Sequence, residues 1–441
     1  MFVLLFKCLL KYLPANTRKF VRANPVAARY AVDGLFIASA TNIAANSLNL
    51  FAMRLGANDY QLSLVQFLPQ IFTLLVLIPG GLYMDSLHNK KRIVIVTLAA
   101  LMFGFLLCSL SPFAGPYSIP FFLGSISLTG AATALYNIAW QSFFPGVVGL
   151  SARNQVLTYR TRVSLFISML VPLLIGVVLA SIVTINGKII AHQVFFICSI
   201  LLLLSAALNF SRFRTRWAIE PKRVSLHEIK KAGKSLLHNK PFVLFALAAL
   251  FFHMTWHFDW TLYFIGQVNY LKMNEFQLGL IPLSAAAIQL LTLKFWSRKN
   301  ERYGVVLPFT FGILGLGLCP LFMIIAVSLP VSVGPHLFVV LHLIAHIPVC
   351  VITLNLFQCL LQVVDEEYRS FSMSVFACLI CLSNAVMPVA GVALYHALGG
   401  DINGFRYTFG IIFVLRIVAA GLWLLRWRSQ SLVSAQLQSN P

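Results

Sequence analysis

Long apolar runs recur along almost the whole chain of 441 residues. Each run is about 20 residues long, which is the length that a helix needs to cross the roughly 30 Å hydrocarbon core of a bilayer. Strands of a membrane barrel would instead give segments of about ten residues with alternating polarity. The sequence therefore predicts an all-α integral membrane fold with twelve transmembrane helices. The candidate spans are residues 28–51, 60–83, 93–111, 118–144, 163–185, 189–211, 241–268, 276–296, 304–328, 336–361, 371–398 and 403–426.

The composition excludes a water-soluble domain, because 59% of the residues are hydrophobic and only 10% are charged. The net charge of +21 would suggest a nucleic-acid partner in a soluble protein. In a membrane protein, however, the cytoplasmic loops retain Lys and Arg. We therefore expect no nucleic-acid partner and both termini in the cytoplasm. The basic segments are the N-terminus, residues 88–92, Arg153 with Arg160 and Arg162, residues 212–240, residues 294–302, and Arg426 with Arg428.

The predicted spans form two groups of six. Residues 212–240 are the only long hydrophilic interruption, so we expect a basic cytoplasmic linker there. It separates an N-terminal half at 28–211 from a C-terminal half at 241–427. Residues 1–27 carry charges within a short apolar stretch and have no clear small-residue cleavage site, which favours an interfacial amphipathic segment over a secretory signal. Residues 428–441 are expected to form a cytoplasmic tail.

The two halves also show an internal repeat at an offset of 216 residues. The stretch "NDYQLSL" at 58–64 matches "NEFQLGL" at 274–280. Repeated halves are common in transporter folds, and they predict a pseudo-symmetric arrangement of the two groups of six helices. Three further pairs lie at the same offset: Asp85 and Glu301, Arg153 and Arg369, and Pro172 and Pro388.

Each half carries part of one loop motif after its second span. The first copy has Gly81-x-x-x-Asp85 followed by "KKR" at 90–92, and the second has "ERYG" at 301–304. The combined pattern resembles G-x-x-x-D-R-x-G-R-R, the signature loop of the major facilitator superfamily (MFS). The resemblance covers nearly the whole chain, and it implies the MFS fold and secondary transport by rocking of the two halves.

By this resemblance, the acid of each loop contacts neighbouring helix ends and basic residues, which closes the cytoplasmic side in one state of the transport cycle. The alternative is that the basic cluster only fixes topology and that Asp85 caps a turn. The first copy departs from the pattern at Ser86, His88 and Asn89. The gating candidates are Gly81, Asp85, Lys90, Lys91, Arg153, Glu301, Arg302, Gly304 and Arg369.

Two further motifs of the superfamily are missing. Ile126 stands in the fourth span where proton-coupled members have Arg, and "MLVPLLIG" at 169–176 departs from the antiporter pattern G-P-x-x-G-G. Both absences count against a typical proton-driven drug antiporter.

The resemblance implies a central cavity lined by the first, fourth, seventh and tenth helices. Polar residues are costly inside a membrane, so those on cavity helices are candidates for substrate binding. Hydrogen bonding between packed helices is the alternative. In the N-terminal half, the candidates are Ser39, Asn42, Asn46 and Asn49 on one face of the first span, and Asn137, Trp140 and Gln141 on the fourth.

The seventh span carries an aromatic and imidazole face with a carboxylate beside it. We name Asp259, with His253 or His257, as the candidate for proton coupling, since a histidine titrates near neutral pH. Satisfied structural histidines and paired metal ligands, as in a metal-ion carrier, are the alternatives. The substrate-binding candidates in the C-terminal half are His253, Trp256, His257 and Trp260 on the seventh span and His342 and His346 on the tenth.

Other ionisable or reactive residues within the spans are interpreted as structural. Arg416 lies in the middle of the last span, where it should face protein or water, and its partner is not evident from the sequence. Asp33 lies opposite the asparagine face of the first span. Cys378-x-x-Cys381 lies within an apolar helix, which favours packing over a metal or redox site.

No phosphate-binding loop or nucleophile constellation is present, which argues against an enzyme and against ATP-driven pumping. We expect a monomeric secondary carrier in the bacterial-type inner (plasma) membrane, with no cofactor and no metal. Its partners would be the lipid bilayer, a small organic substrate and protons. An efflux carrier for amphipathic compounds and a transporter-like protein that serves as a sensor or assembly partner are the alternatives.

Overall fold

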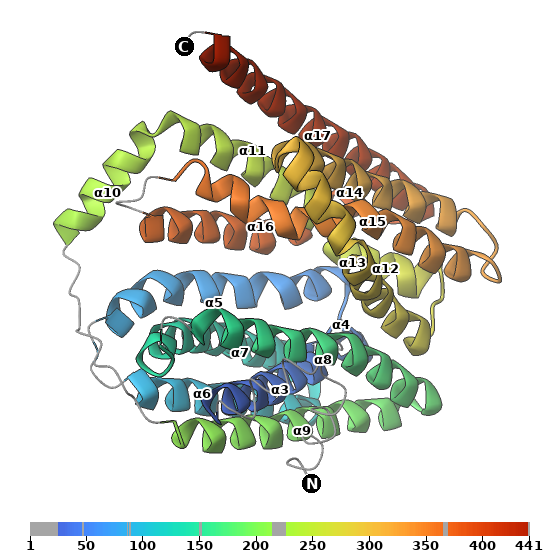
Figure 1. Ribbon diagram of the computed structural model, residues 1–441. Helices are drawn as coiled ribbons and strands as arrows, with labels where there is room; N and C mark the ends of the chain where they lie inside the picture. The colour runs from blue at the N-terminus through green and yellow to red at the C-terminus, as the bar shows by residue number, and fades with distance from the viewer. Residues whose placement is uncertain are drawn as a thin grey trace. The chain divides into compact units, whose positions relative to one another are not determined.

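The computed structural model describes residues 25–45, 48–85, 87, 90–149, 152–213, 226–364 and 369–439, and all regular structure within them is helical (Figure 1). The expected amphipathic segment at the N-terminus lies almost wholly outside these residues. So do Asn46, Ser86, His88 and Asn89.

The described helices confirm the predicted all-α membrane fold. Eleven described stretches are long and apolar enough to span a membrane, and one of them, Lys90–Gly146, contains two spans, α6 and α7. The described residues therefore account for the twelve predicted spans. The N-terminal half contains α3 (Pro25–Ala45), α4 (Leu48–Arg54), α5 (Asp59–Asp85), α6 (Lys90–Leu110), α7 (Ser118–Phe143), α8 (Arg153–Ser181) and α9 (Ile185–Ser211).

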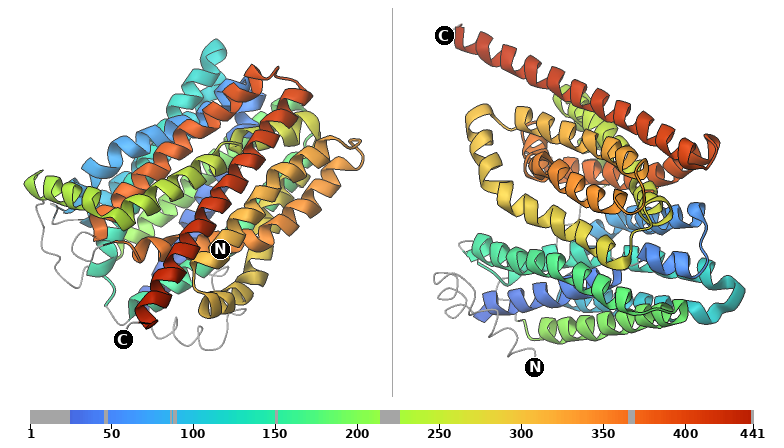
Figure 2. Two further views of the ribbon diagram at one scale, coloured as in Figure 1. Left: turned by 90° about the horizontal axis from the view of Figure 1, so that it is seen from above. Right: turned by 90° about the vertical axis from the view of Figure 1, so that its right-hand side faces the viewer.

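The C-terminal half begins with a helix inside the expected linker, α10 (Leu226–His238), and its last helix, α17, is the longest of those described and packs along α14 (Figure 2). The seventh span is made of α11, α12 and one π-helical turn. The bounds are α11 (Lys240–His257), α12 (Trp260–Ile265), the π-helical turn η4 (Gly266–Tyr270), α13 (Glu275–Tyr303), α14 (Val306–Val327), α15 (Gly334–Leu361), α16 (Arg369–Ala397) and α17 (Ile402–Ser439).

Contacts divide the chain into two compact units. Unit 1 comprises residues 1–56 and 72–223, and unit 2 comprises residues 57–71 and 224–441. The first part of α5 thus groups with unit 2. The amphipathic α10 also belongs to unit 2, where Leu236 joins the apolar core while Lys230 and Lys234 are exposed.

The helices of the two units pack according to the same plan. In unit 1, α6 packs with α7 and α9, and α3 packs with α8 and α9. In unit 2, α14 packs with α15 and α17, and α11 packs with α16 and α17. Each helix of the first set is the counterpart of one in the second, so the structure confirms two pseudo-symmetric six-helix halves.

The matched stretches of the repeat form the same capping box before α5 and α13. The Gln61 main-chain N–H donates to Asn58 Oδ1 (2.9 Å), and the Asn58 N–H donates to Gln61 Oε1 (3.0 Å). Asn274 and Gln277 repeat both bonds, at 2.8 and 3.0 Å. Two main-chain N–H groups that have no partner within the helix are thereby satisfied.

We predict that Asn274→Ala lowers the stability of the protein by about 1 kcal/mol, because the first turn of α13 loses its cap. Asn274→Ser retains a capping oxygen and should stay close to the wild type. Thermal unfolding of the detergent-solubilised variants measures the difference. Equal unfolding temperatures for the Ala and Ser variants would contradict a stabilising role of the cap.

Candidate functional site

The seventh span is broken between α11 and α12. α11 ends at His257, and Phe258 and Asp259 form a turn before α12 begins at Trp260. Gly391 of α16 faces this turn, and a Cβ atom at that position would overlap the Phe258 carbonyl oxygen. Only glycine therefore allows α16 to approach the break this closely.

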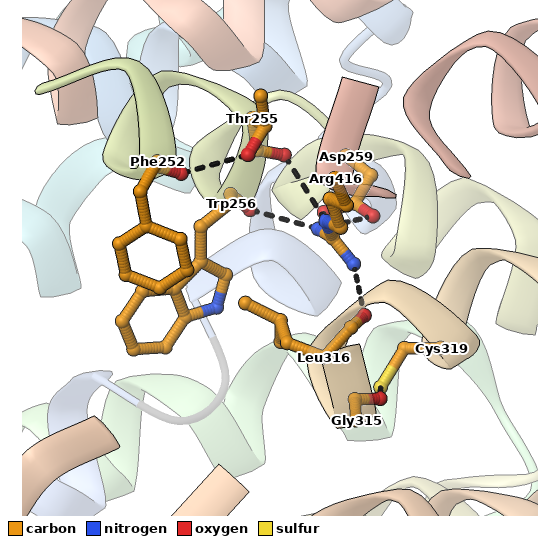
Figure 3. Close-up of polar contacts among 8 residues, drawn as sticks. All are labelled: Phe252, Thr255, Trp256, Asp259, Gly315, Leu316, Cys319 and Arg416. Atoms are coloured by element: carbon orange, nitrogen blue, oxygen red, sulfur yellow. Dashed lines mark hydrogen bonds and ion pairs between the residues drawn. The ribbon is translucent and has the colours of Figure 1, made fainter. Parts of the chain in front are cut away.

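A buried ion pair occupies the break (Figure 3). Arg416 Nη2 donates to both carboxylate oxygens of Asp259, at 2.7 and 2.8 Å, and both side chains are only 1% exposed. Arg416 lies 14 residues after Ile402 and 13 before Ser429, so the pair is halfway along the last span. Asp259 is thus the partner of Arg416 that could not be found from the sequence.

The same guanidinium satisfies main-chain carbonyl groups around the break. Arg416 donates to the carbonyl oxygens of Thr255 (3.2 Å), Trp256 (3.2 Å) and Leu316 (2.9 Å) (Figure 3). The first two belong to the last turn of α11, where carbonyl groups lack helical partners. The arrangement also suits the helix dipoles, because a cation lies at the end of α11 and an anion at the start of α12.

An aromatic and imidazole face adjoins the break, as the sequence predicted for α11. The His257 ring lies 5.2 Å from that of His253 and 4.6 Å from that of Trp260, and the His253 ring stacks on Trp256 at 5.8 Å. His257 Nδ1 lies 3.0 Å from Ser383 Oγ on α16. Trp260 is 37% exposed, so this face has an accessible edge.

His253 is 4% exposed, and neither of its ring nitrogens has a hydrogen-bond partner among the described residues. Leaving both nitrogens unpaired costs free energy that a bound polar group or water could recover. Asp259, in contrast, contacts the Arg416 guanidinium rather than an imidazole. Proton coupling through Asp259 therefore has to be considered together with Arg416.

The two histidines of the tenth span form a separate pair on α15. Their ring centroids lie 4.0 Å apart, and His346 Nδ1 lies 2.8 Å from the His342 carbonyl oxygen. Among the described residues, no ring contact joins this pair to His253 or His257. The described residues contain no group of three or more His, Cys, Asp and Glu side chains that could hold a metal ion.

The candidates in unit 1 lie in varied environments. On α3, Ser39 is half-buried, and Asn42 donates to the Ala38 carbonyl (2.8 Å) and to Ser168 Oγ on α8 (3.0 Å). Asn49 of α4 is half-buried, and its Oδ1 has no hydrogen-bond partner among the described residues. The bond from Asn42 shows that part of this polar face joins helices.

On α7, Asn137 and Gln141 are exposed, one turn apart. Trp140 is buried instead, with its ring stacked on Phe144 at 5.3 Å and the Arg160 guanidinium 4.1 Å from its centroid. The two amides, unlike Trp140, are therefore accessible on the surface of unit 1.

Arg160 also pairs with the fully buried Asp33 at 3.3 Å. A buried carboxylate paired with a neighbouring helix fits the structural role expected for Asp33.

Two of the three basic gating candidates of unit 1, Lys91 and Arg153, bond to main-chain carbonyl groups. Lys91 Nζ donates to the carbonyl oxygens of Ser211 and, at 3.0 Å, Phe213, at the end of α9. Arg153 donates to those of Pro145 (3.3 Å) and Val148 (3.2 Å). Lys90 is buried, Gly81 lies in the last turns of α5, and Asp85 ends that helix with a side chain that is not described.

The second loop ends α13 at Gly304, whose φ of +73° is a conformation that favours glycine. Glu301 and Arg302 are exposed, and the side chain of Arg369 is not described. Asn300, which precedes this motif, exchanges two amide hydrogen bonds with the fully buried Asn355 of α15, at 2.6 and 2.8 Å. Neither asparagine was predicted, although a polar Asn355 inside an apolar span was a usable signal.

The family model of the Major Facilitator Superfamily matches residues 34–341. Since this is more than half of the chain, the protein belongs to that superfamily, as the loop motif predicted. Members of the superfamily are generally transporters rather than enzymes, and the chain has their multi-pass membrane fold.

Several solved transporters share the fold. A bacterial homologue of the iron transporter ferroportin in an inward-facing state is 13% identical, with a TM-score of 0.73 over 91% of this chain and 98% of that chain. A D-xylose-proton symporter is 10% identical, with a TM-score of 0.71 over 90% and 96%. A POT family transporter in complex with 5-aminolevulinic acid is 12% identical, with a TM-score of 0.66 over 89% and 94%. No curated protein sequence matches the chain.

We predict that Arg416→Gln destabilises the protein by about 3–5 kcal/mol, because it leaves the Asp259 carboxylate buried and unpaired. Combining it with Asp259→Asn removes both charges and should recover part of that loss. Arg428→Gln, on an exposed position of the same helix, serves as the control. Thermal unfolding of the two single variants Arg416→Gln and Asp259→Asn, the double variant and the control forms the test. Additive losses in the double variant would contradict direct coupling of the pair.

Proposed function

We propose that the protein is a secondary active transporter that moves a small organic solute across the membrane by alternating access. Membership of the superfamily supports transport in general. The observation that carries the finer proposal is the break in the seventh span, where an aromatic and imidazole face meets a buried ion pair halfway through the membrane. Broken helices at this depth commonly supply substrate sites in transporters.

The chemistry beside the break suits an organic ligand. Trp256, His257 and Trp260 offer flat rings, and His253 offers ring nitrogens that have no partner among the described residues. Ligand sites typically combine such apolar walls with a few polar groups that fix orientation.

A second candidate function is transport of metal ions, because the structural neighbours include a bacterial metal transporter. The paired histidines on α15 are the observation in its favour. An efflux carrier for amphipathic compounds, supported by the Trp-rich face, remains an alternative within the same class. A sensor or assembly partner that does not transport is the alternative outside it.

Proton coupling through Asp259 is part of the proposal. Protonation of the carboxylate would remove the negative charge that faces Arg416, while the guanidinium would keep its three carbonyl partners. The angle between α11 and α12 would then depend on whether the Asp259 carboxylate is protonated. The placement of the basic loops supports a topology with both termini in the cytoplasm. A monomeric state and the bacterial-type inner (plasma) membrane are further parts of the proposal.

We predict that one class of organic solute raises the unfolding temperature of the purified protein and that Trp260→Ala weakens this effect. A ligand at 100 times its dissociation constant stabilises the folded state by about 2.7 kcal/mol. The panel comprises sugars, amino acids, organic anions, lipophilic cations and divalent metals. If only divalent metals raise the unfolding temperature, the transported species is a metal ion and not an organic solute. If no compound in the panel raises it, the non-transporting alternative is favoured.

We predict that Asp259→Asn in proteoliposomes abolishes accumulation driven by a pH gradient but retains exchange of the solute found in the panel. The amide keeps a hydrogen-bonding group for Arg416 but cannot take up a proton at neutral pH. Asp401→Asn, at an exposed carboxylate before α17, is the control. If the Asp259→Asn variant still accumulates the solute under a pH gradient, Asp259 is not the coupling group.

A further inference from the structure

Unit 2 has an apolar groove between α11 and α17, away from the break. Its volume is about 830 Å³. Leu244 and Leu247 on one face of α11 line it, together with Leu425 of α17, and all three side chains are more than half exposed. The spacing of three residues on α11 keeps these side chains on the same side of the helix.

The length of the groove matches the thickness of one leaflet of the hydrocarbon core. Its lining along α11 extends from Pro241, in the first turn of the helix, to Phe251. Ten residues of helix correspond to about 15 Å, which is half of the roughly 30 Å hydrocarbon core. The groove therefore matches an acyl chain in length, and it extends from the first turn of α11 toward the break.

The outer end of the groove is polar and positive. Arg426 and Ser429 of α17 and Gln362 at the end of α15 line it, and none of the lining residues is acidic. Arg426 Nε is buried and has no hydrogen-bond partner among the described residues. The guanidinium rests 5.3 Å from the Phe245 ring centroid and 5.6 Å from that of Trp423, so aromatic contacts fix its position.

We propose that this groove binds one anionic phospholipid, with an acyl chain along α11 and the phosphate on Arg426. An arginine beside a phosphate forms charge-assisted hydrogen bonds through its guanidinium. The charge selects an anionic headgroup, and the apolar length selects a lipid over a free phosphate. Basic sites between helices at the cytoplasmic surface recognise anionic headgroups elsewhere, and Arg426 lies at the end where the positive residues gather.

The occupied site would join two helices that also meet at the ion pair. α11 contributes the Thr255 and Trp256 carbonyl groups at the break, and α17 contributes Arg416. A lipid between the cytoplasmic ends of these helices adds contacts that exist only in the folded protein. It should therefore stabilise unit 2 by mass action, independently of which solute is transported.

The test uses the full chain, purified in a neutral detergent and depleted of lipid. We expect dioleoyl phosphatidylglycerol to raise the unfolding temperature and to bind with one high-affinity copy in native mass spectrometry. Dioleoyl phosphatidylcholine and inorganic phosphate should do neither. Equal stabilisation by phosphatidylcholine or by phosphate would overturn the proposal, as would the absence of any effect of phosphatidylglycerol.

Two variants localise the effect. Arg426→Gln should weaken phosphatidylglycerol binding at least about tenfold, since it removes a charge-assisted hydrogen bond. Ala248→Trp places a large ring in the groove and should weaken binding without any change in charge. Arg426→Lys keeps the positive charge and should retain most of the affinity. Retained binding in this variant would show that position 426 tolerates substitution, so that the loss in Arg426→Gln reports the charge and not a folding defect.

Arg428→Gln is the matched control, because it removes the same charge from an exposed position two residues along α17 that does not line the groove. It should leave phosphatidylglycerol binding within about twofold of the wild type, a change of about 0.4 kcal/mol. An equal loss in Arg428→Gln and Arg426→Gln would indicate diffuse attraction to a basic surface and would reject the site. Unchanged binding in both Arg426→Gln and Ala248→Trp would reject it as well.

Discussion

The ion pair between Arg416 and Asp259 makes the broken seventh span possible. Lipid offers no hydrogen bonds, so every main-chain group freed by a break in a membrane helix needs a partner within the protein. Arg416 supplies partners for two carbonyl groups of α11 and one of α14, while Asp259 neutralises its charge. The aromatic and imidazole face beside the break, and the close approach of α16, both depend on the shape that this pair maintains.

The two halves repeat a packing plan but not its chemistry. Ala40 and Trp256 lie 216 residues apart, and each offers its carbonyl oxygen to the last helix of its own unit. In unit 1 the donor is the Ser199 hydroxyl, at 3.0 Å, whereas in unit 2 it is the Arg416 guanidinium. A hydroxyl needs no counter-ion, so α3 of unit 1 requires no acidic partner at this position. The two halves thus differ in chemistry at a contact that both share.

The sequence was sufficient to predict what depends on local pattern. Hydrophobic length predicted the twelve spans, and the 216-residue offset predicted the repeat that the paired capping boxes of Asn58 and Asn274 display. Contacts between distant residues were beyond it. The partner of Arg416 is 157 residues away, and the buried Trp140 contacts Arg160 of another helix. Spacing along one helix shows which residues share a face, but not what that face meets.

The glycine that faces the break has a mechanical consequence. At Gly391, α16 meets the Phe258 carbonyl group without a side chain in between. A backbone contact has no rotamers to exchange. The angle between α11 and α12 can therefore change while the turn stays in contact with α16, and no side chain has to repack there. The resistance of the seventh span to bending at the break would then depend on the few hydrogen bonds of Arg416. Removing that guanidinium would leave only the backbone contact with Gly391 at this point.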